Sequence, residues 1–221
     1  MDLYGNVASD MEEGLIAPED LSWFALFEFS NSGYVKDDEK DEINPEKLLK
    51  ELQDSQEVAN KYRADAGMEK LFVTGWHTAP FYNETTNNLE WALLLEDESG
   101  NTTVNYKTKL LGRRGVMDSV LVCEPEILDG ILPTYENLLA DYNYVPGDTY
   151  AEYQEGDKLA KYGLTALIVG GGSVAAAKLG LFAVIGKFFA KAWKLIVVAA
   201  IGVVTMFKRF FGGGMKRDQD A

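Results

Sequence analysis

The sequence has very few of the residues that bind metals or form covalent cross-links. It contains one cysteine, Cys123, and one histidine, His77, in 221 residues. A single cysteine excludes an intramolecular disulfide, and the two residues together are too few for an ordinary zinc site or a His-pair metal motif. Cys123 closes the apolar run 120–123 and is predicted to be an inert core thiol. His77 precedes Pro80 and is predicted to be structural rather than a general base.

Motifs of the common nucleotide-binding and hydrolytic enzymes are also missing. The chain has no P-loop, no Rossmann fingerprint, no Gly-x-Ser-x-Gly elbow and no His-Glu-x-x-His pair. The run 170–173 is rich in glycine, but it lacks the lysine of a phosphate loop and lies in an apolar stretch. We therefore predict no catalytic residue and no cofactor, and an enzyme is the less favoured class.

Basic residues are scarce in most of the chain. Residues 1–161 hold 33 Asp and Glu against 13 Lys and Arg, a net charge of −20, whereas residues 162–221 hold 2 against 8, a net charge of +6. An acidic domain repels phosphate backbones, so nucleic acid is disfavoured as a partner. The division predicts an acidic soluble domain (1–158), a membrane anchor (159–211) and a polar tail (212–221).

The first part of the acidic domain predicts a strand followed by a helix. The segment Leu21–Phe29 is rich in aromatic residues and has the length of a buried strand. Asn44 and Pro45 predict an N-cap and a first helical residue, and the apolar spacing that follows predicts an amphipathic helix as far as about Ala64.

The second part predicts four strands joined by short turns, a second helix and a last short strand. The helix is expected over 125–139, broken or kinked near Pro133, and the last strand over 142–146. The fold class is α+β, with two helices packed on an antiparallel sheet. The four strands form an antiparallel meander and are expected at 69–76, 89–96, 102–111 and 116–123.

Two apolar runs near the C-terminus predict the membrane anchor, at about 163–186 and 195–211. The first has 24 residues with one charge and can cross a ~30 Å hydrocarbon core, whereas the second needs its flanking lysines to snorkel. A lipid bilayer is therefore the predicted partner, and a buried pair of core helices is the alternative. The residues predicted at the membrane interface are Lys187, Lys191, Trp193, Lys194, Lys208 and Arg209.

The basic residues also predict an orientation. Whether the last segment spans alone or both segments span, the positive-inside rule places the acidic domain outside the cytoplasm. We expect a bacterial cell-membrane protein with an extracytoplasmic domain. Small residues near Gly170 favour self-association, and other envelope proteins are the second expected class of partner.

Three groups of residues in the acidic domain are candidate sites, each with a structural alternative. Acidic residues before the first helix offer oxygen ligands to a metal ion, although they lack EF-hand spacing and solvated charge is the alternative. Two arginines between glycines can bind a carboxylate or phosphate. The alternative is that they balance the charge of the acidic domain at a turn whose glycines need positive φ. Aromatic residues can form a docking loop or a core. The groups are Asp37, Asp38 and Asp41; Arg113 and Arg114; and Trp76, Tyr82 and Trp91.

Several motifs, spread in order along nearly the whole chain, resemble one family. They include Gly33-Tyr-Val-Lys-Asp-Asp38, Gly75-Trp-His-Thr-Ala-Pro80, Leu111-Gly-Arg-Arg-Gly-Val116 and Gly147-Asp-Thr-Tyr-Ala-Glu-Tyr153. The chain resembles a bacterial family of uncharacterised membrane-anchored proteins, known only as a domain of unknown function. The resemblance implies a membrane location and no particular activity. It also implies a signal peptide and a β segment upstream of Gly5-Asn6, which the printed sequence lacks.

Three possible functions follow from these observations. The leading hypothesis is a non-enzymatic, membrane-anchored module that presents its acidic domain to envelope partners. The alternatives are an enzyme that uses Asp37, Asp38 or Glu90 with Arg113, and a tethered domain that senses a small ligand. The enzyme hypothesis predicts a pocket that joins the acidic loop to the Gly-Arg-Arg-Gly turn.

Overall fold

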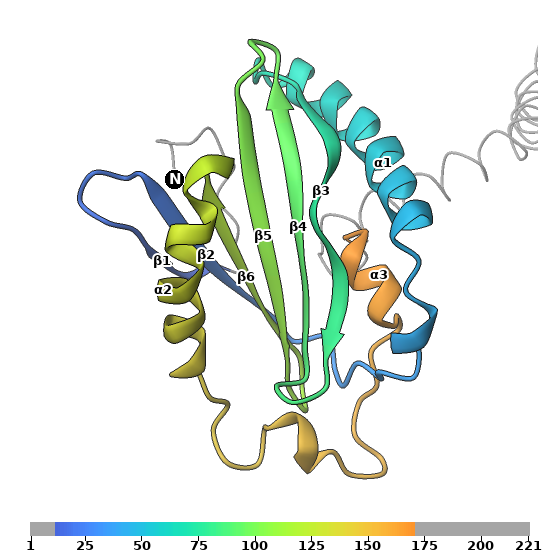
Figure 1. Ribbon diagram of the computed structural model, residues 1–221. Coiled ribbons are helices and arrows are strands. Elements are labelled where there is room, and N and C mark those ends of the chain that lie inside the picture. The colour runs from blue at the N-terminus through green and yellow to red at the C-terminus, as the bar shows by residue number, and fades with distance from the viewer. Residues whose placement is uncertain (1–11, 171–221) are drawn as a thin grey trace, which may run out of the picture. The chain divides into compact units, whose positions relative to one another are not determined.

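The computed structural model describes residues 12–170, and its central feature is a six-stranded antiparallel sheet (Figure 1). The strand order is β1-β2-β6-β5-β4-β3, and each neighbouring pair is antiparallel. The predicted meander is confirmed, because β3 to β6 follow one another in both sequence and sheet order. The strands are β1 (Glu12–Ile16), β2 (Trp23–Ser30), β3 (Leu71–Asn83), β4 (Asn88–Asp97), β5 (Thr102–Leu111) and β6 (Val116–Cys123).

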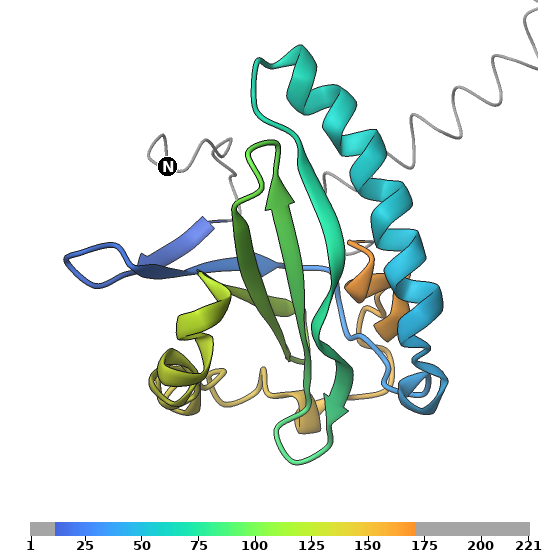
Figure 2. The same ribbon diagram turned by 45° about the horizontal axis from the view of Figure 1, so that its top comes forward.

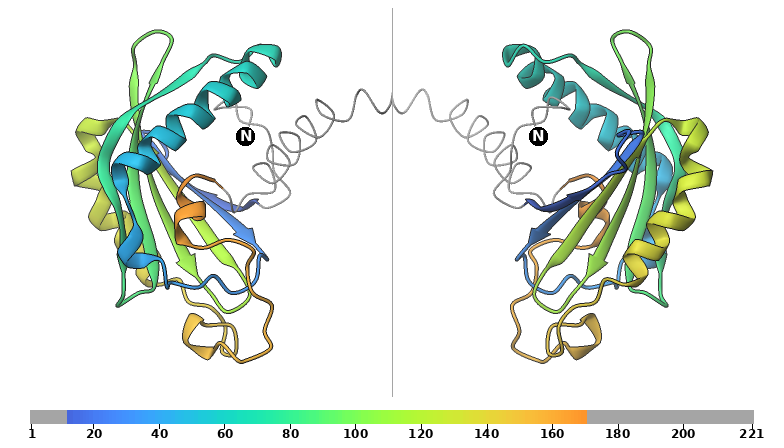
Figure 3. Two further views of the ribbon diagram at one scale, coloured as in Figure 1. Left: turned by 90° about the vertical axis from the view of Figure 1, so that its right-hand side faces the viewer. Right: turned by 90° about the vertical axis from the view of Figure 1, so that its left-hand side faces the viewer.

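Helices cover both faces of the sheet and give the described residues three layers (Figure 3). The helix α1 lies on one face with the short helix α3, and α2 lies on the other. The predicted α+β class with two packed helices is confirmed. The bounds are α1 (Pro45–Asp65), α2 (Leu128–Ala140) and α3 (Leu164–Ile168), with 3₁₀ turns η2 (Lys40–Glu42), η3 (Pro125–Ile127) and η4 (Tyr150–Glu152).

Two apolar cores lie on opposite faces of the sheet because successive side chains of a strand point in opposite directions. On β4, Leu89 and Trp91 point into the core beneath α1 and α3, whereas Ala92 points into the core beneath α2. Cys123 is buried with a free thiol in the second core, so the prediction of a core cysteine is confirmed. A sheet covered on both faces needs apolar residues at most positions, which explains its imperfect alternation.

The helix α1 begins and ends close to the predicted residues and lies along β3 (Figure 2). The side chain of Asn44 accepts a hydrogen bond from the Lys47 backbone nitrogen at 3.0 Å, as expected of an N-cap. Near its other end, Asn60 is buried and its amide makes two hydrogen bonds to the backbone of Leu71, at 2.7 and 3.0 Å. These bonds fix the start of β3 against the helix.

Three elements differ from the prediction. The strand β3 continues to Asn83 past Pro80, because an edge strand with bulges tolerates a proline that cannot donate to the ladder. The helix predicted over 125–139 is the 3₁₀ turn η3 followed by α2, and α2 is not broken at Pro133, since packing of Leu128 and Tyr135 in the core holds it together despite one missing backbone hydrogen bond. The segment 142–146 is not a strand.

The end of the described chain belongs to the core rather than to a separate segment. Leu164, Leu167 and Ile168 of α3 are at most 2% exposed and pack beneath α1. The packed core therefore continues past residue 158 to Ile168. No helix within residues 12–170 is long and apolar enough to cross a bilayer. The remainder of the first predicted membrane segment, all of the second and the polar tail lie outside the described residues, as do Lys187, Lys191, Trp193, Lys194, Lys208 and Arg209.

Candidate functional site

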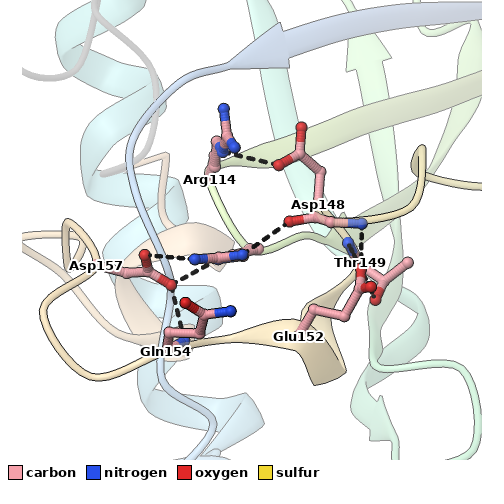
Figure 4. Close-up of polar contacts among 8 residues, drawn as sticks. Arg114, Asp148, Thr149, Glu152, Gln154 and Asp157 are labelled. Atoms are coloured by element: carbon pink, nitrogen blue, oxygen red, sulfur yellow. Dashed lines mark hydrogen bonds and ion pairs between the residues drawn. The ribbon is translucent and has the colours of Figure 1, made fainter.

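The two arginines of the Gly112–Gly115 turn bind carboxylates of the segment 147–157 (Figure 4). Arg113 donates from Nε and Nη2 to both carboxylate oxygens of Asp157, at 2.6 and 2.9 Å, and from Nη1 to the carbonyl oxygen of Gly147 at 3.0 Å. Arg114 pairs with Asp148 at 2.7 Å and stays 68% exposed. The predicted grip on a carboxylate exists, but its carboxylates come from the chain itself.

This contact is a structural clamp. The Arg113 guanidinium, with the backbone nitrogen of Gln154, lowers the pKa of Asp157 to about 2. Glu152 accepts hydrogen bonds from Thr149 and from the Gly147 backbone nitrogen, which closes the same segment on itself. The Nε, Nη1 and Nη2 atoms of Arg113 all donate to groups of the chain itself. We therefore do not place a ligand site at the clamp.

The glycines of this turn are needed for close packing rather than for positive φ. A Cβ added at Gly115 would overlap the carbonyl oxygen of Ser30, and one at Gly112 would meet the ring of Tyr144. Neither glycine has the positive φ expected from the turn. The turn is held between β2 and the segment that follows α2.

The acidic loop before α1 does not gather its carboxylates around one point. Asp37 accepts a hydrogen bond from the Tyr82 hydroxyl at 3.1 Å. Glu39 accepts from the backbone nitrogen and hydroxyl of Thr165, at 3.2 and 2.8 Å, and so caps the first turn of α3. Asp38 and Asp41 point to solvent. No group of three or more His, Cys, Asp or Glu residues suited to a metal ion occurs in residues 12–170.

The predicted aromatic residues belong mainly to the core. Trp91 is 1% exposed, and Trp76 packs against the same core while its indole nitrogen donates to the Pro45 carbonyl oxygen at 3.0 Å. Tyr82 also packs there. Phe81, by contrast, is 42% exposed. The structure thus favours the core interpretation over an exposed docking loop.

The enzyme hypothesis grouped residues that the fold separates. Glu90 and Phe81 pair across β4 and β3 and face α2, whereas their neighbours Leu89 and Tyr82 face the other core. The sheet therefore lies between Glu90 and Asp37. Arg113 is bonded to Asp157 and not to any of these carboxylates.

A cleft of about 440 Å³ lies between α2 and strands β3 to β5, and we name it the α2 cleft. Glu90 of β4 and Glu136 of α2 supply its two carboxylates, and none of its lining residues is basic. The remaining polar and aromatic residues of its lining are Phe81, Asn83, Thr86, Asn88, Tyr106, Tyr142 and Asn143.

Glu90 is the more buried of the two acids in the α2 cleft. Burial raises its pKa, the Tyr106 hydroxyl lowers it by donating to Oε2 at 2.8 Å, and the charge of Glu136 raises it again. In the described residues the second oxygen, Oε1, accepts no hydrogen bond from the protein. A perturbed carboxylate in a cleft is a candidate for ligand binding.

A second depression, of about 500 Å³, lies between α1 and β3. Its amides are already used, because Gln53 donates to Val73 and Asn60 bonds to Leu71. Lys50 also stands beside its acidic residues. We therefore place the candidate site in the α2 cleft.

Sequence reasoning named Glu90 but missed the partners that make it a site. Glu90 is the only charged residue between Leu89 and Leu95, and a lone charge in an apolar strand was the available signal. Glu136 and Tyr142 reach the same cleft only through the packing of α2 on the sheet, which no local pattern reports.

The fold and the cleft define a three-layer α+β domain with an acidic depression. The chain belongs to the family described as "Protein of unknown function (DUF2167)", which matches residues 1–202 of the 221. No curated protein and no solved structure matches the chain.

Proposed function

We propose that the chain is a non-enzymatic interaction module held at a membrane by residues 171–211. The division of charge carries this proposal: a domain with a net charge of −20 is followed by apolar runs flanked by Lys and Arg. Because α3 packs in the core of the domain, we assign the proposed anchor to residues after Gly170. A bilayer and other envelope proteins, or a second copy of the chain, are the proposed partners.

The contacts of Arg113, the arginine of the enzyme hypothesis, support a module rather than an enzyme. Arg113 and Asp157 clamp the segment after α2, and Glu39 caps α3. These contacts stabilise the domain, and the proposal gives them no role in chemistry.

Carbonate extraction of membranes from cells that express the full chain tests the anchor. We expect the wild type to remain with the membrane pellet, and a Val184→Asp, Val198→Asp variant, with one Asp in each apolar run, to be released, because each buried Asp costs about 2.5–3.5 kcal/mol at the centre of a membrane helix. The matched control is Val184→Ala, Val198→Ala, which should stay in the pellet. Recovery of the wild type in the soluble fraction without detergent would contradict the proposal.

The α2 cleft favours a second function, that of a tethered ligand-binding domain. Glu90, Glu136 and Tyr106 line one concave surface, where the Tyr106 hydroxyl donates a hydrogen bond to Glu90. The two functions are compatible, since a module held at a membrane can also bind a ligand. Titration of the full chain with candidate ligands, described below, tests this function separately from membrane extraction.

A further inference from the structure

The α2 cleft has the chemistry of a site for a positively charged group. Its two carboxylates come from different elements, β4 and α2, and its lining holds no Lys, Arg or His to neutralise them. The acidic domain around it carries a net charge of −20 over residues 1–161, which raises the local concentration of cations. Glu90 is partly buried and Glu136 is exposed, so a cation bound between them would offset the cost of burying the Glu90 carboxylate while staying open to entry from solvent.

The walls of the α2 cleft suit an organic cation better than a bare metal ion. Phe81, Tyr106 and Tyr142 contribute aromatic rings, which attract ammonium and guanidinium groups through their electron-rich faces. Asn143 adds an amide oxygen that can accept a hydrogen bond from an N–H donor, whereas the Asn83 oxygen already accepts from the backbone nitrogens of Thr85 and Thr86. By contrast, residues 12–170 contain no cluster of three acidic, His or Cys side chains of the kind that holds a metal.

We propose that the α2 cleft binds an organic cation, with the carboxylates of Glu90 and Glu136 receiving an ammonium or guanidinium group. Oε1 of Glu90 is the first acceptor, because Oε2 already accepts the Tyr106 hydroxyl at 2.8 Å and is held in place by it. Phe81 and Tyr142 then flank the alkyl chain next to the charge. The inference rests on the ligand-binding function proposed above and is independent of the membrane anchor.

The cation has two possible sources with the same chemistry: a free diamine or polyamine, and a Lys or Arg side chain of a partner protein. Length distinguishes them, because a peptide can also contact residues outside the cleft. Tighter binding of a basic peptide than of a free amine identifies a side chain, and the reverse order identifies a small molecule. Both results support the cation site.

Isothermal titration calorimetry on the full chain in detergent tests the proposal. The probes are spermidine, 1,5-diaminopentane and an acetylated Lys-Lys peptide, with 1,5-pentanediol as the neutral analogue of the diamine. We expect binding of the amines and none of the diol. Glu90→Gln and Glu136→Gln should each weaken amine binding about tenfold or more, since each removes a charged acceptor while keeping its shape.

The matched control is Glu126→Gln, which removes an exposed carboxylate of η3 outside the cleft and should leave the affinity unchanged. Thermal melts of all variants establish that they fold. Amine binding should also weaken as pH falls toward the pKa of Glu90, which burial raises above its ordinary value. No binding at millimolar amine, equal binding by the Gln variants, or equal binding of the diol would overturn the site, whatever membrane extraction shows.

Discussion

At the scale of single residues, the best-connected charged group in the described chain is the Arg113–Asp157 pair. Its side chains are only 14% and 23% exposed, and the bidentate contact ties the turn after β5 to the segment after α2. Arg114 and Asp148 make a similar pair nearby, but the arginine is 68% exposed. Exposed ion pairs contribute little to stability, so the two pairs provide a matched comparison.

Asp157→Asn should lower the melting temperature by several degrees at neutral pH, whereas Asp148→Asn should change it by about a degree or less. The folded pKa of Asp157 is about 2, below its ordinary value of 3.8. Its stabilisation is therefore complete above about pH 4 and is lost as pH falls toward 2. Melts followed by circular dichroism should show the gap between wild type and Asp157→Asn closing over that window. A constant gap would argue against the ionised carboxylate as its cause.

At the scale of elements, the sequence predicts the bounds of those helices and strands whose ends are set by local capping and turn residues. Asn44 and Pro45 mark the start of α1, and the two strands β5 and β6 have the bounds that their turns predict. The strand β1 has no such signal: it is five residues with a bulge next to Gly14, and only its pairing with β2 makes it a strand. Apolar patterns alone also cannot separate a core helix from the start of a membrane segment.

The helix α3 illustrates that last difficulty. Its five residues have the composition of the apolar run that follows, yet they pack in the core. Glu39, which lies 126 positions before Thr165, accepts hydrogen bonds from the first turn of α3 and helps to hold it there. A contact between residues so far apart in sequence cannot be read from periodicity. The candidate site shows the same limit, since Glu90 and Glu136 meet only after α2 packs on the sheet.

Removal of this cap should destabilise the domain. Glu39→Ala should lower the free energy of unfolding by about 1 kcal/mol, the usual cost of losing a side-chain cap. The neighbouring exposed residue Glu42 provides the control, and Glu42→Ala should cost less than about 0.5 kcal/mol. Urea denaturation of the full chain in detergent, followed by tryptophan fluorescence, measures both. Equal effects would show that the Glu39–Thr165 contact does not hold α3.

At the scale of the whole molecule, the separation of charge between domain and tail leads to a prediction of orientation. If the last apolar run spans alone, the basic residues after it favour a cytoplasmic C-terminus and an acidic domain on the other side; if both runs span, the lysines between them favour a cytoplasmic loop and the same side for the domain. The single native cysteine, Cys123, allows this orientation to be tested by thiol labelling. Burial raises the pKa of the Cys123 thiol to about 11 and leaves that side chain 4% exposed, so native Cys123 should not react with thiol reagents.

We therefore predict that Ser99→Cys, in the exposed turn between β4 and β5, reacts with a membrane-impermeant maleimide in intact bacterial cells expressing the full chain. The wild type, with Cys123 alone, should remain unlabelled until it is denatured, which makes it the control for both accessibility and folding. Labelling of Ser99→Cys only after lysis would place the acidic domain in the cytoplasm. That result would overturn the orientation while leaving the anchor and the cation site to their own tests, because neither depends on the side of the membrane that the domain occupies.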